Sequence, residues 1–307
     1  MNKNIVLLGA TSFIATNFIK NYRKNKIKAV TRKIQNYHNN TSNITWLECD
    51  LNSKKDLLEV IDEDDIVINC AYSKDGIKEN LNIIRNLIEC CNIKNIDKLI
   101  HFSTAVVTGV QDYVIIDEEA ICNPITNYQK DKLQIESCFL DSVLNFNLII
   151  LRPTAVFGMD GKNLIKNINS AKNSSFIINF FKMITLGNRH MHLVSVENVI
   201  NTMDFFIDDN SNIKIEIFFI SQDNDSFNYY KNVYPMILEH LNKFSFSYIS
   251  NLAIPKYFLT YLLMFFNKRY EEVSCVYSPE RLKIRGVSFE NSLEDSIKRY
   301  LEKIDLH

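Results

Sequence analysis

The sequence has little glycine and no long apolar run, and each of these shortages excludes a class of protein. Seven glycines in 307 residues exclude a collagen-like repeat, and no glycine-rich linker separates domains. The most apolar stretch, Tyr257–Phe266, has ten residues, whereas a membrane-spanning helix needs about 18 or more. We therefore predict no integral membrane span. We interpret the stretch as a core or dimer helix, with a membrane-surface helix as the alternative.

A surplus of charge is also missing. Lys and Arg total 35 against 36 Asp and Glu, so the net charge is -1 and no basic excess is available to hold nucleic acid. The seven cysteines are scattered, odd in number and without a C-x-x-C pair, which is typical of buried thiols in a reducing compartment. No signal-peptide pattern precedes Ile5–Leu8. We expect a soluble, cytoplasmic protein that binds no nucleic acid.

The chain does contain short β-branched apolar runs that alternate with longer segments of helical period, the pattern of βαβ units. Seven strands are expected, at Ile5–Leu8, Ile27–Val30, Ile44–Leu47, Ile66–Asn69, Leu99–Phe102, Leu148–Leu151 and Ile213–Ile220. Apolar stripes predict two helices, along Leu81, Ile84, Leu87, Ile88 and Cys91 and along Val196, Val199, Ile200, Met203 and Phe206. A last helix would be capped by Ser292 with Asp295 and would bury Leu293, Ile297, Tyr300, Leu301 and Ile304.

These elements predict an α/β protein with a Rossmann-type doubly wound parallel sheet and a smaller, mostly helical C-terminal lobe that binds substrate. The dinucleotide-binding domain would span residues 1–160 and be completed by about 191–222. The substrate-binding lobe would consist of residues 161–190 and 223–307.

The end of the first strand carries the first candidate site. The turn Gly9-Ala10-Thr11-Ser12-Phe13-Ile14-Ala15 leads into a helix, and such a turn holds a pyrophosphate in open α/β sheets. A lone glycine is also common in an ordinary turn. At the end of the second strand Arg32 stands where a dinucleotide fold meets the adenosine ribose, and no Asp or Glu occurs between Ile27 and Asn43. This pattern favours NADP(H); NAD(H) stays open if Arg32 is only a surface charge.

Tyr128 and Lys132 form the second candidate site. They are four residues apart and share one face of a helix. Thr126 with Gln129 resembles a capping box, which would place Tyr128 in the first turn. The helix dipole and Lys132 are then expected to lower the pKa of Tyr128 and make it a general acid or base. The alternative is an ordinary solvent-facing helix.

The order of these motifs resembles that of the extended short-chain dehydrogenase/reductase family, which contains nucleotide-sugar epimerases, dehydratases and 4-ketoreductases. The resemblance covers nearly the whole chain. It is carried by the segments Gly9–Ala15, Asp50-Leu51, Asn69-Cys70-Ala71, Asn80–Cys91, His101–Gly109, Tyr128 with Lys132, Leu151–Gly158 and His192–Val199.

The resemblance implies roles for single residues. Thr104 would bind the substrate oxygen, Tyr128 would transfer the proton, and Lys132 would hold the nicotinamide ribose. The cofactor would be bound by Gly9, Thr11, Ser12, Phe13, Ile14, Arg32, Asp50, Leu51, Cys70, Ala71, Tyr128, Lys132 and Pro153, and the substrate by Thr108, Arg189 and His192. No metal is implied, although His190 and His192 could be ligands by spacing alone.

Departures from the family pattern indicate which of the family's reactions to expect. Ser12 and Ala15 replace two glycines, and Thr108 stands where the family usually has a substrate-pocket tyrosine. Ala105-Val106 supplies neither the acidic pair of the 4,6-dehydratases nor the cysteine of the 3,5-epimerase/reductases. The expected function is NADPH-dependent reduction of a nucleotide-activated 4-keto(-6-deoxy) sugar in bacterial surface-polysaccharide precursor synthesis. The alternatives are an NAD(P)-dependent nucleotide-sugar 4-epimerase and a non-catalytic NADP-sensing regulator; a homodimer is common in the family.

Overall fold

The computed structural model describes residues 4–35, 40–109, 111, 114–211, 214–243 and 275–304. The apolar stretch Tyr257–Phe266 lies outside the described residues. Within the described part of the chain, the structure has no helix that is both long enough and apolar enough to cross a bilayer.

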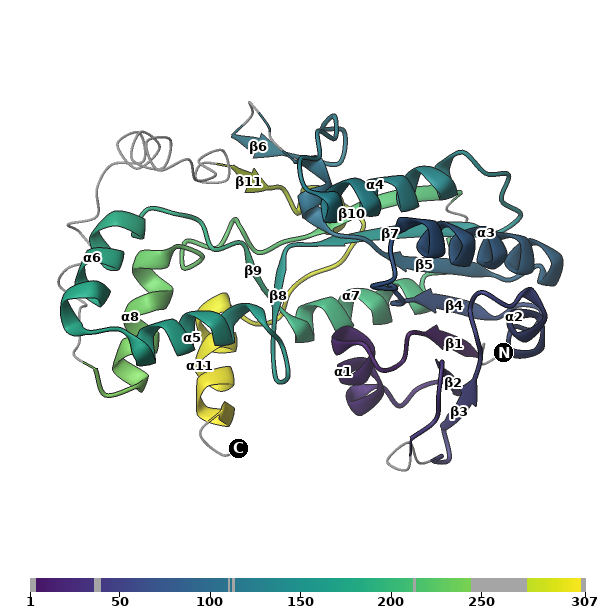
Figure 1. Ribbon diagram of the computed structural model, residues 1–307, viewed down its shortest axis with the longest axis horizontal. Coiled ribbons are helices and arrows are strands. Elements are labelled where there is room, and N and C mark those ends of the chain that lie inside the picture. Colours follow the sequence, from purple (N-terminus) through teal and green to yellow (C-terminus); the bar gives the residue numbers. More distant parts are fainter. Residues whose placement is uncertain are drawn as a thin grey trace. The chain divides into compact units, whose positions relative to one another are not determined.

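A seven-stranded sheet forms the centre of the fold, with the strand order β10-β7-β5-β4-β1-β2-β3 (Figure 1). The six strands from β7 to β3 run parallel. The strands are β1 (Ile5–Leu8), β2 (Ile27–Thr31), β3 (Ile44–Glu48), β4 (Ile66–Asn69), β5 (Lys98–Phe102), β7 (Asn147–Pro153) and β10 (Ile215–Ile220). Successive strands are added on one side of β1 up to β3 and on its other side from β4 onward, and ligands of such sheets bind outside the carboxyl ends of the strands at this switch point.

Helices cover both faces of this sheet because each buries one apolar stripe. In Figure 1, α3 and α4 lie side by side on one face, and α1 and α7 lie on the other. The helices are α1 (Phe13–Asn21), α2 (Lys54–Val60), α3 (Ile77–Lys94), α4 (Asn127–Leu140) and α7 (Val196–Asp208). One core cluster joins α2, α3 and α4 to the sheet through residues such as Leu57, Leu87, Phe139, Val67 and Leu148.

The chain divides into two compact units that interleave along the sequence. The first contains the described residues of 1–107, 124–152 and 200–218, and the second those of 108–123, 153–199 and 219–307. These boundaries differ from the predicted ones, since residues 108–123, 153–160, 191–199 and 219–222 fall in the second unit. The binding role predicted for each lobe stays a proposal.

The second unit has small sheets and several helices. Its elements are β6 (Ile115–Ile116), β8 (Ala155–Phe157), α5 (Asn163–Asn173), α6 (Phe176–Leu186), β9 (Leu193–Ser195), α8 (Tyr230–His240), β11 (Val276–Tyr277), α10 (Glu280–Ile284) and α11 (Leu293–Ile304). β8 pairs with β9, and β6 pairs with β11, both in parallel. Its core contains Leu164, Met183, Tyr234 and Leu301.

The predicted fold class is confirmed, as is a strand at each of the seven expected places, with ends that differ by up to two residues. The stripe along α7 is fully buried. Ser292 accepts the Asp295 amide at 3.1 Å and so caps α11 as expected. All seven cysteines are free.

Candidate active site

The turn after β1 brings two strand ends close together. Gly9 has φ +70°, and a Cβ atom there would lie 2.7 Å from the backbone of Ala71, which follows β4. The Ser12 amide closes the turn on the Gly9 carbonyl oxygen at 2.9 Å, and α1 then starts at Phe13. Only glycine fits this position, because the conformation and the space both exclude a side chain.

The turn suits a pyrophosphate. Amides in the first turn of α1 have no acceptor within the helix, and no acidic side chain occupies that turn. Ser12 is the N-cap residue but makes no side-chain cap hydrogen bond, and its buried hydroxyl lies beside the Cys70 thiol. Burial raises the pKa of Cys70 to about 12, so this neighbour is a neutral thiol. The residues present therefore fit the dinucleotide that the sequence predicts.

A buried polar pair fixes the end of β4. The Asn69 amide group lies 3.2 Å from Nδ1 of His101 on β5, and both side chains are almost fully buried. The Oδ1 atom of Asn69 accepts the Ala71 amide at 3.0 Å. Burial, assisted by the charge of Lys132, lowers the pKa of His101 well below its ordinary value, so the imidazole is neutral. Asn69 and His101 thus hold the predicted cofactor residue Ala71 in place.

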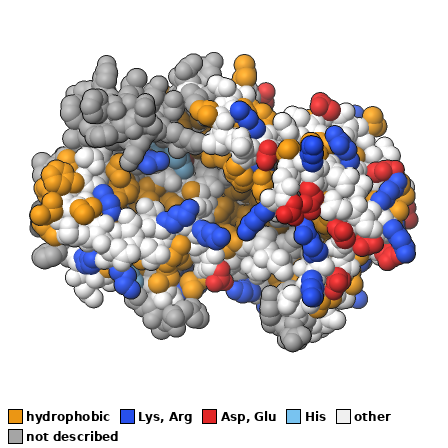
Figure 2. All heavy atoms as spheres, in the orientation of Figure 1, with side chains coloured by type: hydrophobic (Ala, Val, Ile, Leu, Met, Phe, Trp, Pro, Cys, Tyr) orange, Lys and Arg blue, Asp and Glu red, His pale blue; other side chains and the backbone are white. Residues whose placement is uncertain are grey.

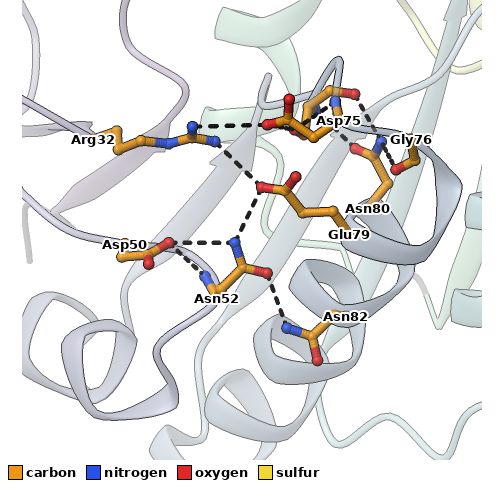
Figure 3. A network of polar contacts seen from close by, with 9 residues as sticks. Arg32, Asp50, Asn52, Asp75, Gly76, Glu79, Asn80 and Asn82 are labelled. Carbon is orange, nitrogen blue, oxygen red and sulfur yellow. Dashed lines mark hydrogen bonds and ion pairs between the residues drawn. The ribbon is translucent and has the colours of Figure 1, made fainter.

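Arg32 belongs to a network with carboxylates of α3 and the loop before it (Figure 3). Its guanidinium lies 3.4 Å from Glu79 and 3.9 Å from Asp75. Asn52 donates from its side chain to Glu79 at 3.2 Å and from its backbone to Asp50 at 3.0 Å. The loops after β2 and β3 and the start of α3 are therefore linked by one set of polar contacts, and two carboxylates already accompany Arg32.

The start of α4 has the predicted capping box. Thr126 accepts the Gln129 amide, and the Gln129 side chain accepts the Thr126 amide at 2.9 Å. Tyr128 is consequently in the first turn and is about half exposed (46%). Its ring packs edge-on against Tyr72 with centroids 5.7 Å apart.

Lys132 lies one turn further along α4 and is buried. Its ammonium donates to the carbonyl oxygen of Phe102, the last residue of β5, at 2.9 Å, and lies 5.0 Å from the centre of the Tyr72 ring. This bond ties α4 to the strand end that Thr104 follows by two residues. Thr104 itself is partly buried and opens a 3-10 turn through its carbonyl oxygen.

The expected electrostatics of this pair need a correction. Burial raises the pKa of Tyr128, whereas the sequence predicted that it would be lowered. The Lys132 ammonium is directed to Phe102, and burial lowers its own pKa to about 8 despite the nearby Glu136 carboxylate. Burial, and not the charge of Lys132 or the helix dipole, therefore sets the direction of the Tyr128 pKa shift.

Sequence reasoning missed a buried ion pair behind these residues. Glu136 of α4 accepts two hydrogen bonds from Arg152 of β7, at 3.1 and 2.6 Å, and both side chains are almost fully buried. Glu136 lies four residues after Lys132 and eight after Tyr128 and therefore shares their face of the helix. That spacing was the available signal. The pair fixes α4 against the sheet.

Four predicted residues, Thr108, Pro153, Arg189 and His192, belong to the second unit. Pro153 ends β7, and Thr108 is buried at the end of a 3-10 helix, where its carbonyl oxygen accepts the Asn123 amide at 2.8 Å. Arg189 is partly buried after α6. His192 has φ +52° and contacts Asp223 at 2.6 Å.

His192 carries a charge in spite of its burial. Burial lowers its pKa, but Asp223 and Cys275 raise it further, to about 10. Its ring also stacks on His190, with centroids 5.6 Å apart. Within the described residues, no three His, Cys, Asp or Glu side chains are grouped as metal ligands.

An open parallel sheet with a glycine turn after β1 and a tyrosine–lysine pair on one helix is typical of dinucleotide-dependent enzymes of the dehydrogenase type. A family model described as the NAD dependent epimerase/dehydratase family matches residues 5–220. The chain belongs to this family, which confirms the resemblance and the predicted class of enzyme.

Relatives agree with this assignment. An Escherichia coli O157:H7 protein named N-acetyl-alpha-D-glucosaminyl-diphospho-ditrans,octacis-undecaprenol 4-epimerase is 22% identical over 222 residues. That match covers 67% of this chain and 63% of the relative, so the chain spans less than two thirds of the relative's length.

Two solved structures share the fold. The Bordetella bronchiseptica enzyme WbmG, in complex with NAD, has a TM-score of 0.72 and 15% identity over 100% of this chain and 95% of that one. A UDP-N-acetylglucosamine 4-epimerase from Bacillus cereus has a TM-score of 0.63 and 16% identity over 98% and 99% of the two chains.

Proposed function

We propose that the protein is an NAD-dependent 4-epimerase of a sugar joined through a diphosphate to a nucleotide or a lipid carrier. The names of the E. coli relative and the B. cereus neighbour support 4-epimerisation of an N-acetylglucosamine derivative. The observation on this chain that carries the proposal is the pairing of Arg32 with Glu79 and Asp75, because it separates an epimerase from the reductase expected from the sequence.

NAD and NADP differ at the 2′-position of the adenosine ribose. The 2′-phosphate of NADP would bring negative charge next to Glu79 and Asp75, and like charges repel. The 2′-hydroxyl of NAD can instead donate to a carboxylate. The local balance of one guanidinium against two carboxylates therefore favours NAD, the cofactor named in the WbmG complex.

The chain's own residues then have defined tasks. Tyr128 takes the proton of the sugar 4-hydroxyl and returns it to the same oxygen, and Thr104 hydrogen-bonds that oxygen. Lys132, with a pKa of about 8, is mostly charged at neutral pH and holds the nicotinamide ribose. The cofactor supplies a reversible hydride transfer at sugar C4, and because the hydride returns, an epimerase consumes no reductant.

The test uses the purified protein without added cofactor or with NAD. UDP-N-acetylglucosamine and, separately, a polyprenyl-diphospho-N-acetylglucosamine are incubated with it, and the 4-epimer is followed by NMR. Formation of the epimer from either substrate without net change in nicotinamide absorbance is the expected result. The two arms identify the carrier.

The reductase remains the second candidate, since Arg32 occupies the position that accommodates a 2′-phosphate in related folds. Stoichiometric oxidation of NADPH by a nucleotide-linked 4-keto-6-deoxy sugar, with no epimer from the first experiment, would establish it instead.

A further inference from the structure

Helix α6 leaves most of its apolar side chains exposed and buries the polar Asn179 together with Met183. Phe176, Ile177, Ile178 and Phe181 are 49%, 63%, 50% and 59% exposed. Asn179, in contrast, is 2% exposed. Surface helices of soluble proteins normally turn their apolar stripe inward, and a contiguous exposed apolar patch marks an interaction site.

The orientation of α6 is fixed by hydrogen bonds made by its buried side. The Asn179 side chain donates to the carbonyl oxygen of Ala171 at 3.2 Å and accepts the Tyr234 hydroxyl at 2.9 Å. Ser175 caps the helix by accepting the Ile178 amide. Rotating α6 about its axis would break the contacts of a buried amide, which is costly. The apolar residues are thus held outward.

The acidic and basic residues of the segment that contains this patch are of one sign. Residues 161–196 include no Asp or Glu, although the whole chain has 36 of them. The same segment has five Lys and Arg residues, Lys162, Lys166, Lys172, Lys182 and Arg189, and the first three are exposed. Figure 2 shows apolar side chains gathered at the left edge, where Figure 1 labels α6, with Lys and Arg side chains beside them over α5. A partner of this surface must be both apolar and anionic.

A second copy of the chain fits less well than a lipid surface. In a two-fold contact the same patch meets itself, so the lysines of α5 would face one another across the interface. An anionic bilayer offers acyl chains below a layer of negative headgroups. An interfacial helix places its apolar face at that boundary and its lysines among the headgroups.

We propose that α6 and the lysines of α5 form a surface that binds an anionic lipid bilayer, with Ile177, Ile178 and Phe181 entering the headgroup region. The contact is peripheral, since within the described part of the chain the structure has no helix fit to cross a bilayer. It does not depend on the proposed epimerase activity, because it rests on α5 and α6 alone.

Co-sedimentation of the full chain with vesicles tests the proposal. Vesicles of equal parts phosphatidylcholine and phosphatidylglycerol should bind the protein, and pure phosphatidylcholine should bind it weakly. The variant I177S/F181S should lower the partition coefficient about 100-fold, since two large apolar side chains no longer enter the bilayer. The variant K166Q/K172Q should lower it about tenfold on the anionic vesicles only.

A matched control is I93S/V143S, which replaces two apolar residues that are 54% and 83% exposed in the first unit. This control should bind vesicles as the unaltered protein does. Failure of the unaltered protein to bind anionic vesicles would overturn the proposal, as would equal losses in the control and in I177S/F181S.

Two further measurements test whether the patch is covered by a second copy of the chain or by another part of the same chain. If I177S/F181S abolishes a dimer seen by analytical ultracentrifugation and vesicle binding is absent, the patch is an interface between two copies. If that variant lowers the melting temperature markedly, the patch packs within the chain. The lipid proposal requires an unchanged or higher melting temperature.

Discussion

The first unit buries apolar side chains under its helices, whereas the second unit has a helix, α6, that leaves most of its apolar side chains exposed. In α3, Ile84 and Leu87 are buried and Arg85 is exposed. In α6, Asn179 is buried and Phe181 is exposed. The packing of α3 gives rigid support to side chains at the strand ends. The packing of α6 leaves an apolar surface exposed. We infer that the first unit carries out catalysis and that the second unit binds the lipid surface.

Loss of the Tyr128 hydroxyl, in the first unit, is expected to have the largest effect on activity, because this hydroxyl is the proposed proton carrier. Tyr128→Phe should cut turnover about 10²–10⁴-fold, roughly 3–5 kcal/mol in the barrier. The fold should persist, since Tyr128 is about half exposed. Turnover is measured as product formation by NMR, and retention of the fold is checked by circular dichroism. Tyr72→Phe is the control, because it removes a nearby hydroxyl and keeps the ring against Lys132. Turnover that is unchanged in Tyr128→Phe would refute this mechanism.

Breaking the buried ion pair between Glu136 and Arg152 in the first unit should cause the largest loss of stability. Arg152→Met leaves the Glu136 carboxylate buried without its partner, which destabilises proteins by about 3–5 kcal/mol. Lys298→Met breaks an exposed pair with Glu294 in the second unit and should have no measurable effect. Urea denaturation compares the two. Similar denaturation midpoints for both variants would show that α4 does not depend on the pair.

The buried asparagine of the second unit should matter less than that pair. Asn179→Ala removes the partner of the Tyr234 hydroxyl and of two backbone carbonyls, a loss of about 1–3 kcal/mol. Tyr234→Phe removes only one of these bonds and should cost about 1 kcal/mol. Thermal or urea unfolding measures both. A stabilising Asn179→Ala would mean that α6 is free to turn its apolar face inward.

The cofactor preference should respond to one carboxylate of the first unit. Glu79→Gln keeps the size of the side chain and removes its charge beside Arg32, so the ratio of NADP to NAD affinity should rise about tenfold, or about 1.4 kcal/mol. Glu89→Gln, on the same helix, is the matched control because Glu89 pairs with Lys54 instead. Titration calorimetry gives both constants. An equal ratio in the two variants would exclude Glu79 as a determinant of cofactor choice.

The smallest expected effect is a pH dependence of cofactor binding. Lys132 has a pKa of about 8, below its ordinary value, so it is charged at pH 7 and mostly neutral at pH 9. A hydrogen bond from a charged donor is stronger than a neutral one by about 1 kcal/mol. NAD affinity should therefore fall about fivefold as the pH rises through 8. Lys132→Met should flatten this profile; an equally steep profile in that variant would assign the dependence to another group.

Local patterns predicted more of the first unit than of the second. The strand Ile66–Asn69 and the capping box at Thr126 depend on neighbouring residues, and the structure has both as expected. The pairs Glu136–Arg152 and Arg32–Glu79 join elements distant in sequence, and single-sequence reasoning did not find them. Nothing in the run Phe176–Leu186 signals that its apolar side faces outward, because that depends on the partner that Asn179 finds in Tyr234.

The interleaving of the two units has a consequence for synthesis on the ribosome. β7 ends at Pro153, yet its neighbour β10 begins only at Ile215. One edge of β7 therefore stays open while more than sixty residues are made, at about 5–20 residues per second. Open strand edges pair with other chains. The nascent protein is thus most prone to aggregation in the seconds before β10 emerges, and a chain truncated before β10 would retain that exposed edge permanently.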